Sequence, residues 1–176
     1  MSILRSFVHR FVVVYSRHRA RYYTNRIYRH AISCGEGLKV NYRSTINENT
    51  YLADHVSFNG MTINGNGECR IGRYFHSGVG CRIITQNHDY DGGRQIPYDS
   101  EREIKKKVII DDFVWLGDRV IVLGGSHIGE GAIVQAGSVV CGDIPPCAIV
   151  GGHPAKVFKY RDKEHFYRLK AEGKFC

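Results

Sequence analysis

Residues 110–144 read IDDFVWLGDRVIVLGGSHIGEGAIVQAGSVVCGDI, and one kind of position in this stretch recurs every six residues. That position holds an aliphatic residue in six consecutive units: Ile110, Leu116, Val122, Ile128, Val134 and Val140. Four residues after each anchor comes a small or aliphatic side chain: Val114, Val120, Ser126, Ala132, Ser138 and Ile144. Neither the 3.6-residue period of a helix nor the two-residue period of a strand produces this spacing. The stretch therefore predicts a repeating solenoid.

The same frame runs upstream to Cys34, with further anchors at Val40, Ile46, Leu52, Phe58, Ile71, Ser77 and Ile83. Between Phe58 and Ile71 the frame slips by one residue, across the glycine-rich run 64–67. We count sixteen units from residue 34 to residue 145. If each unit makes one short strand and one corner, three units close a triangular coil, which gives about five coils stacked on their neighbours. The 20 glycines suit the many corners, because glycine tolerates positive φ. A β-sandwich would instead show turns every 8–12 residues or so.

A fifteen-residue segment interrupts the repeat. After the unit that begins at Ile83, the next anchor is expected at Ile104, so residues 89–103, DYDGGRQIPYDSERE, form an extruded loop. Loops of this length in compact domains are usually functional or disordered. The expected organisation is one solenoid domain over 32–157, preceded by a basic helical segment over 1–31 and followed by a C-terminal helix over 158–176.

The N-terminal segment carries most of the net charge of +8. No acidic residue precedes Glu36, and the same stretch holds seven arginines: Arg5, Arg10, Arg17, Arg19, Arg21, Arg26 and Arg29. An apolar stripe over 3–12 predicts an amphipathic helix. Residues 1–30 are expected either to lie on an anionic membrane surface or to pack on the prism or a neighbouring subunit, with solvated arginines. We do not expect a nucleic-acid partner.

The rest of the sequence predicts a cytoplasmic protein, at most peripheral at the inner face of the membrane. No apolar run reaches the roughly 18–20 residues that span a bilayer, and no secretory signal is recognisable. The six cysteines form no CxxC pair, so they are expected to be reduced and mostly packed.

The repeats and four motifs resemble the hexapeptide-repeat acyltransferases: TQNHDYDGG at 85–93, VWLGDRV at 114–120, IGEGAIVQAGSVV at 128–140 and DIPPCAIVGGHPAKV at 143–157. The chain is most similar to galactoside and maltose acetyltransferases, sugar O-acetyltransferases of surface-polysaccharide synthesis, and streptogramin acetyltransferases. The resemblance covers residues 34–157. It implies a left-handed parallel β-helix and a homotrimer whose active sites lie between neighbouring prisms. It also implies acetyl-CoA as co-substrate and no required metal.

The resemblance also implies roles for single residues. His88, where the repeat gives way to the loop, matches the catalytic histidine. Positions that match the acyl-CoA site are Trp115, Gly117, Asp118, Ala136, Cys141, Gly142, Lys156 and Lys159. The family often has Thr-Lys in place of Cys141-Gly142, so this chain lacks one hydroxyl and one cation there. Acceptor contacts are expected at Asn59 and Asn66, and from the loop side chains Asp89, Asp91, Arg94 and Tyr98. Asp89 and Asp91 either orient His88, bind an acceptor hydroxyl or solvate the loop.

Acyl transfer from a thioester to a sugar needs a base, because a hydroxyl is a very weak acid. A histidine can take that proton near neutral pH. No nucleophilic triad is evident, so direct transfer is expected, in an acetyl-CoA-dependent O-acetyltransferase acting on a sugar of a bacterial surface polysaccharide or related glycan. Other acceptors stay open: a streptogramin-type xenobiotic, or the amino group of a nucleotide sugar. So do acyl chains longer than acetyl, a non-catalytic scaffold, and a zinc hydratase using His76, His88 and His127.

Overall fold

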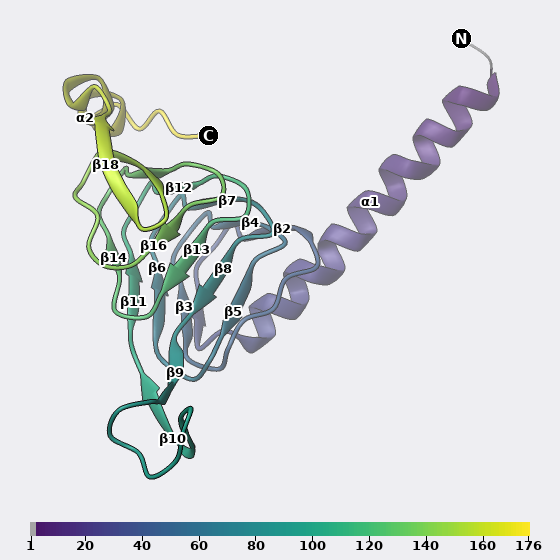
Figure 1. Ribbon diagram of the computed structural model, residues 1–176. Coiled ribbons are helices and arrows are strands. Elements are labelled where there is room, and N and C mark those ends of the chain that lie inside the picture. Colours follow the sequence, from purple (N-terminus) through teal and green to yellow (C-terminus); the bar gives the residue numbers. More distant parts are fainter. Residues whose placement is uncertain (1–2) are drawn as a thin grey trace.

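The structure of the chain is a computed structural model that describes residues 3–176, with side chains from residue 13 onward. It is a left-handed parallel β-helix of triangular section, with one helix at each end (Figure 1). Three parallel sheets form the faces of the prism, which we call faces A, B and C. Successive corners stack into three edges, named A/B, B/C and C/A after the faces that they join. The structure thus confirms the β-helix that the six-residue repeat predicted.

The strands are short because each occupies one side of a coil. Face A consists of β1 (Ser33–Cys34), β3 (Thr50–Leu52), β6 (Cys69–Ile71), β11 (Val108–Ile110) and β14 (His127–Ile128). Face C consists of β5 (Thr62–Asn64), β8 (Arg82–Ile84), β13 (Ile121–Leu123) and β16 (Val139–Val140). Face B consists of β2 (Lys39–Tyr42), β4 (Ser57–Asn59), β7 (His76–Val79), β12 (Trp115–Leu116), β15 (Ile133–Val134), β17 (Ala148–Gly152) and β18 (Ala155–Tyr160).

The solenoid has about six coils, one more than the repeat count predicted. Face B has seven strands, of which only β18 runs antiparallel, so six parallel strands remain. The additional coil arises because the repeat continues through β17, whose Val150 is fully buried.

Both columns of the repeat point into the prism, as predicted. The anchors from Leu116 to Val140 are fully buried, and the side chains four residues after them, from Val120 to Ile144, are buried as well. The buried serines also bind the next coil: the Ser126 hydroxyl accepts a hydrogen bond from the Gly142 amide at 3.0 Å. The Ser138 hydroxyl accepts one from the Gly152 amide at 3.2 Å. A serine fits this column because it is small and its hydroxyl is satisfied.

The frame slip has a different origin from the one predicted. Phe58 is followed after three residues, not four, by the buried Met61, so one residue is lost before the glycine-rich run. Two residues are then gained inside that run, because Ile63 and Cys69 are six apart where the preceding coil has a spacing of four. The enlarged corner is held by Asn47, whose side-chain amide donates to the carbonyls of Gly65 (2.7 Å) and Gly67 (2.9 Å).

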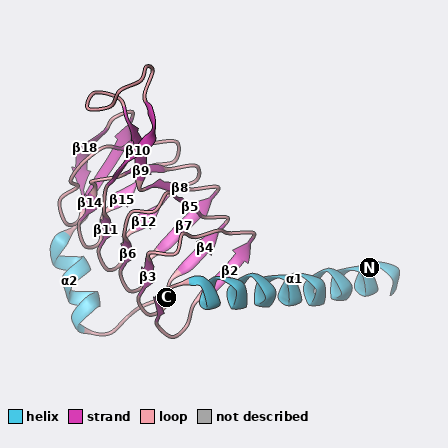
Figure 2. Ribbon diagram, turned by 90° about the horizontal axis from the view of Figure 1, so that it is seen from below, coloured by secondary structure: helices cyan, strands magenta, loops and turns pink. Residues whose placement is uncertain are grey.

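The extruded segment is an antiparallel hairpin that leaves the prism at the C/A edge (Figure 2). Its strands are β9 (Gln86–Asp89) and β10 (Asp99–Lys105). The prediction that Ile104 is the next anchor is wrong: Ile104 pairs with Asn87 in the hairpin, and the coil resumes at the buried Val108. The hairpin strands begin at Gln86 and end at Lys105, which pair with each other, so the insertion is longer than the predicted 89–103.

Two helices flank the solenoid: α1 (Ile3–His30) and α2 (Lys163–Ala171). The last turns of α1 pack on β2, with Ile27 buried and the Thr24 hydroxyl accepting a hydrogen bond from the Val40 amide at 3.0 Å. The rest of α1 projects away from the prism in both views (Figures 1 and 2). The side chains of the predicted apolar stripe over 3–12 lie outside the described residues. Among the described residues, no helix combines the length and the apolar character needed to cross a bilayer.

Candidate functional site

His88 lies in β9, at the base of the hairpin and on the C/A edge. Its ring is exposed and stacks on the Tyr98 ring, with 4.1 Å between centroids and 12° between planes. Within residues 13–176, neither ring nitrogen of His88 takes part in a hydrogen bond or ion pair. The imidazole is therefore held by its flat face, while its two nitrogens are free to exchange a proton with a bound molecule.

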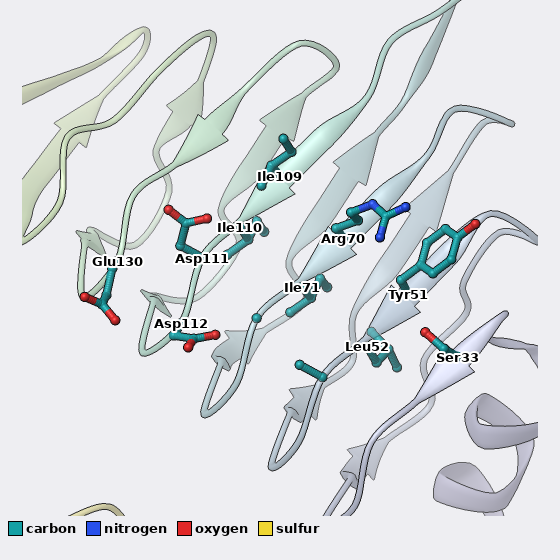
Figure 3. Close-up of a pocket in the computed structure, with 12 residues that line it drawn as sticks. Ser33, Tyr51, Leu52, Arg70, Ile71, Ile109, Ile110, Asp111, Asp112 and Glu130 are labelled. Carbon is teal, nitrogen blue, oxygen red and sulfur yellow. The ribbon is translucent and has the colours of Figure 1, made fainter. Parts of the chain in front are cut away.

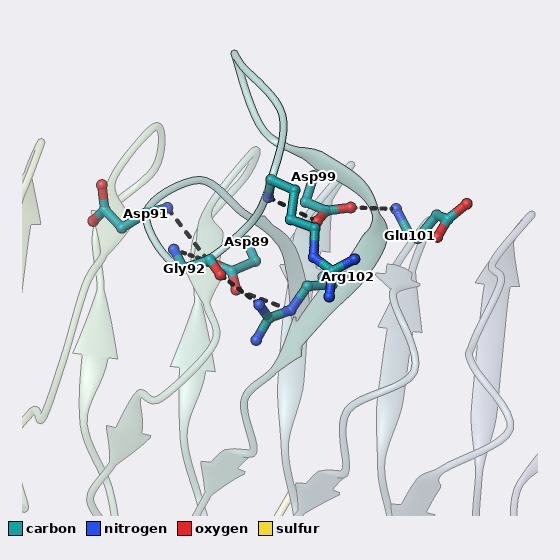
Figure 4. Close-up of polar contacts among 7 residues, drawn as sticks. Asp89, Asp91, Gly92, Asp99, Glu101 and Arg102 are labelled. Carbon is teal, nitrogen blue, oxygen red and sulfur yellow. Dashed lines mark hydrogen bonds and ion pairs between the residues drawn. The ribbon is translucent and has the colours of Figure 1, made fainter.

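Two buried aspartates hold the hairpin (Figure 4). Asp89 accepts hydrogen bonds from the amides of Gly92 (2.7 Å) and Asp91 (3.3 Å), and its other oxygen lies 3.4 Å from Arg102 Nε. Asp99 accepts from the amides of Arg94 and Glu101, both at 3.0 Å. These amides, with Arg102 nearby, hold the pKa of Asp99 below its usual value. Asp89 thus shapes the loop and makes no described contact with His88.

Most of the residues predicted to contact an acceptor gather on this side of the prism. Asp91 and Arg94 are exposed on the hairpin, and Tyr98 lies against His88. Asn66 occupies the adjoining corner, where its backbone N–H donates to the side-chain oxygen Oε1 of Gln86 at 2.8 Å. Gln86 lies two residues before His88. Asn59 is the exception, because it lies on face B.

Face B carries a second group of predicted residues around Trp115. Equivalent positions stack along this face, so Trp115 lies between His76 of β7 and Ile133 of β15. The Trp115 side chain is half exposed. Asn59 Nδ2 is 3.4 Å from His76 Nε2 and also donates to the Ser77 carbonyl at 2.7 Å. His76 was expected only as a zinc ligand, although His76 and Trp115 each directly precede an anchor of the repeat, Ser77 or Leu116.

A cavity of about 490 Å³ opens beside Trp115, between face B and the C-terminal helix. Its walls include His76 and the rings of Tyr74, Phe113, Phe166 and Phe175. No sequence signal predicted this cavity, because the packing of the C-terminal segment on the A/B edge has no local pattern.

Three predicted acyl-CoA positions, Gly117, Asp118 and Ala136, lie at the adjoining B/C edge. Asp118 Oδ1 accepts a hydrogen bond from the Val79 amide at 2.7 Å and so joins two coils. A Cβ on Gly117 would lie 2.6 Å from the Ala136 amide nitrogen, so only glycine fits between these coils. Both positions therefore have a structural role of their own.

Lys156 and Lys159 lie in β18, paired with Gly151 and Ile149 of β17. A bulge between these pairs offsets their odd spacing, so both lysines leave the same outward side of face B. Lys159 belongs to the same row as Trp115, three strands away. At about 4.8 Å per strand, the two positions are about 14 Å apart.

Cys141 and Gly142 are not with this group. They lie at the C/A edge, on the same edge as the hairpin, where the Gly142 amide is bound by Ser126. The structure therefore separates them from the other predicted acyl-CoA positions of the same chain.

The two groups lie on opposite sides of the prism. In a triangular section, the C/A edge that carries His88 is opposite face B, which carries Trp115. A single chain therefore does not bring these two side chains together. The histidines of the zinc alternative also diverge: His76 lies on face B and His127 on face A, where it contacts Asp111 at 3.0 Å. In the described part of the chain, no cluster of three metal-ligating side chains is present.

Face A has a shallow hollow of about 630 Å³ that none of the predicted site residues lines (Figure 3). Arg70 lies over the Tyr51 ring at 4.2 Å and is bonded to Glu68 at 2.7 Å. Asp112 pairs with Arg73 at 2.7 Å. Arg70 and Asp112 thus already have partners within the chain, and we assign this hollow no role.

Comparisons with known proteins agree with this architecture. Residues 107–142 match the family described as bacterial transferase hexapeptide (six repeats). A chloramphenicol acetyltransferase from Klebsiella aerogenes is 35% identical over 120 residues, which cover 58% of this chain and 57% of that protein. A putative lipopolysaccharide biosynthesis O-acetyl transferase, WbbJ, from Escherichia coli (strain K12) is 44% identical over 69 residues, covering 39% and 35%. The chain thus spans less than two thirds of the length of these relatives.

One solved structure shares the fold over most of its length. A variant of AntD, an N-acyltransferase from Bacillus cereus in complex with dTDP-4-amino-4,6-dideoxyglucose and coenzyme A, aligns with a TM-score of 0.66 at 15% identity. The alignment covers 85% of this chain and 94% of that one. In its repeat, its fold and these relatives, the chain is thus similar to the hexapeptide-repeat transferases, whose family model matches residues 107–142.

Proposed function

We propose that the chain is an acetyl-CoA-dependent O-acetyltransferase acting on a sugar of a bacterial surface polysaccharide or related glycan, with His88 as general base. The observation that carries the proposal is the state of His88: exposed, restrained by Tyr98, and with both ring nitrogens unengaged by the described residues. Its place where the hairpin leaves a rigid scaffold supports a catalytic role over a structural one.

In the proposed reaction His88 takes the proton of an acceptor hydroxyl as the oxygen attacks the thioester carbonyl. The C–S bond then breaks, and the imidazolium returns the proton to the leaving thiolate of coenzyme A. General-base help of this kind typically contributes about 10²–10⁴ in rate. Coenzyme A is bound in the AntD structure, and the two sequence relatives are named as acetyltransferases, which supports acetyl-CoA as the donor.

We propose that the working unit is a homotrimer. The support is geometric: His88 and the row that runs from Trp115 to Lys159 lie on opposite sides of one prism, so a site using both needs two subunits. Closed three-fold symmetry would give each interface the same pair of surfaces. Sedimentation should therefore detect a trimer at micromolar concentration, and a fully active monomer would contradict the proposal.

Three classes of acceptor follow from the comparisons and the cavity. The similarity to WbbJ supports a lipopolysaccharide-type sugar, and the aromatic cavity beside Trp115 would also suit the apolar body of a xenobiotic. The 35% identity to a chloramphenicol acetyltransferase supports the second candidate. The amino sugar in the AntD structure keeps N-acetylation as a third outcome of the same assay.

The test is release of free thiol from acetyl-CoA, measured with a panel of glycans, nucleotide-amino sugars and antibiotics. Mass spectrometry of the products identifies the acetylated class. His88→Ala is expected to lower turnover about 10²-fold or more, with acetyl-CoA binding retained. Near wild-type turnover in this variant would remove His88 from the mechanism, and no turnover with any acceptor would reject the enzyme.

We further propose that the projecting α1 holds the protein loosely at an anionic membrane surface. The support is the absence of any acidic residue before Glu36 and the exposure of Arg17, Arg21, Arg26 and Arg29 along the helix. Such a position would suit a lipid-linked glycan acceptor.

A further inference from the structure

The hairpin carries two layers of side chains on opposite sides of its strand pair. Asp89 and Asp99 face each other as Cα partners. His88 precedes Asp89 within β9, so its side chain leaves the other side of the strand, and Tyr98 lies directly before β10. A bulge follows Asp99, so the Cα partner of His88 is Glu103, and Tyr98 reaches the His88 ring from the turn side of the Asp89–Asp99 pair. The contact between them therefore spans the Asp89–Asp99 pair, and it depends on the register at that pair.

The aspartate layer fixes this register. Both carboxylates are nearly inaccessible, at 8% and 5% relative exposure, and each bonds to backbone amides of the hairpin. Arg102 joins the two sides of the turn, because it contacts Asp89 and also donates to the Gly92 carbonyl (Figure 4). The residues on the opposite side of the ladder are thus carried by a backbone with little freedom.

We propose that Tyr98 is the positioning residue for His88, acting through its ring and not through its hydroxyl, with Arg102 and the two aspartates holding Tyr98 in place. The proposal rests on the function proposed for His88 above. It gives Tyr98 a different role from the acceptor contact expected from the sequence. A ring stacked at 4.1 Å and 12° limits rotation of the imidazole while leaving both in-plane nitrogens free.

This arrangement differs from the usual way of orienting a catalytic histidine. Commonly one ring nitrogen is hydrogen-bonded to a carboxylate or a carbonyl, and the other does the chemistry. Within the described residues His88 has no such partner, and the adjacent Asp89 is engaged by Gly92 and Arg102. Stacking is then the device that remains to hold the ring in a productive orientation. Loss of such orientation lowers the rate of the chemical step more than it weakens substrate binding.

Two substitutions separate the ring from the hydroxyl. Tyr98→Phe keeps the ring and is expected to retain kcat within about twofold. Tyr98→Leu keeps apolar bulk but removes the flat ring, and it is expected to lower kcat about 10- to 10²-fold with little change in the acceptor KM. Tyr90→Leu is the matched control, because Tyr90 is an exposed tyrosine of the same hairpin outside this stack. It should leave kcat unchanged.

A second measurement does not depend on turnover. In NMR spectra of histidine-labelled protein, with His88→Gln used for assignment, the ring-current shift of the His88 signals should persist in Tyr98→Phe and vanish in Tyr98→Leu. Arg102→Met should weaken the same shift and lower kcat in the same direction. If the shift behaves so but wild-type protein releases no thiol with any acceptor, the stack stands and the proposed enzyme function fails.

Two results would overturn the positioning role. Equal loss of kcat in Tyr98→Phe and Tyr98→Leu would assign the effect to the hydroxyl. A rise in acceptor KM at unchanged kcat, or wild-type kinetics in Tyr98→Leu, would show that the ring does not position the base.

Discussion

Tyr74 and Phe113 stack at the A/B edge with their ring planes 3° apart and their centroids 5.3 Å apart. Both residues have positive φ, at 54° and 60°, where a side chain ordinarily costs about 1–2 kcal/mol. His55, one coil earlier, has φ of 58° and stacks on Tyr74 at 4.6 Å. The column of rings stabilises an edge whose backbone favours glycine.

This combination predicts an inverted order of stability at Phe113. Phe113→Ala loses the ring contacts but keeps the strained φ, and should destabilise the fold by about 2 kcal/mol or more. Phe113→Gly loses the same contacts and relieves the strain, so it should be the more stable variant by about 1 kcal/mol. At Ile109, in the ordinary strand β11, Gly should instead be less stable than Ala by about 0.5–1 kcal/mol. Urea unfolding measures the stability of the Ala and Gly variants at Phe113 and at Ile109. If the Gly variant were less stable than the Ala variant at both positions, the strain at Phe113 would not contribute as described.

Acid should weaken the ion pairs that Glu68 forms with Arg70 and Lys107 on the C/A side of face A. The Glu68 carboxylate lies 2.7 Å from Arg70 Nε and 2.8 Å from Lys107 Nζ, and these partners lower its pKa from 4.5 to about 2. The pKa of the folded state is below that of the unfolded state. The pairs therefore stabilise the fold above about pH 4.5, and this contribution is lost as the pH falls from there through about 2.

Glu68→Gln should accordingly lower the urea midpoint at pH 7, and the gap to wild type should narrow at pH 3. Glu48→Gln, at an exposed glutamate outside the described ion pairs, serves as the control. A gap that stays constant between the two pH values would show that the pairs do not titrate as described.

The repeat could be predicted because an inward side chain is required in every unit of the solenoid, and Val134 or Ser138 meets that requirement locally. The corner at Met61 could not be predicted. The repeat loses one residue before Met61 and gains two after Ile63, and the net shift of one residue is the same as that of a single insertion. The sequence does contain a signal for the aromatic column, because His55, Tyr74 and Phe113 each follow an anchor by three residues. Seeing it requires knowing that every third unit belongs to the same edge.

The candidate site was predicted as a set of residues but not as an arrangement. His88 and Trp115 are 27 positions apart, and only the length of the hairpin insertion decides which sides of the prism they occupy. The contacts of Asp89 and Asp99 depend on the hairpin register, which no local pattern specifies. Sequence therefore indicated the acidic loop, whereas the stack of Tyr98 on His88 required the structure.

Charge reversal should locate the anionic end of the donor. Lys156 and Lys159 leave the outward side of face B, in line with Trp115. Lys156→Glu combined with Lys159→Glu should raise the KM for acetyl-CoA about tenfold, which corresponds to about 1.4 kcal/mol. Lys39→Glu is the matched control, because Lys39 is exposed in β2 at the far end of the same face. If these substitutions raised the KM for the acceptor and not the KM for acetyl-CoA, the anionic end of acetyl-CoA would lie away from Lys156 and Lys159.

Flotation with liposomes should test the role of α1. Each basic residue near an anionic surface contributes about 1 kcal/mol, an attraction that salt screens. The intact protein should therefore bind phosphatidylglycerol vesicles at low ionic strength and dissociate as salt is added. Deleting residues 1–20 should abolish binding while leaving the solenoid folded, because the contacts of Thr24 and Ile27 with β2 remain.

A charge-reversed pair, Arg17→Glu with Arg21→Glu, keeps the helix and should also lose binding. Arg19 is a poorer choice, since its guanidinium packs over Tyr42 at 5.6 Å and its removal would disturb the base of the helix. An intact protein that stays unbound at low ionic strength would reject the membrane surface. If deletion of 1–20 then changed the sedimentation coefficient beyond the mass removed, α1 would instead be packing on a neighbouring subunit.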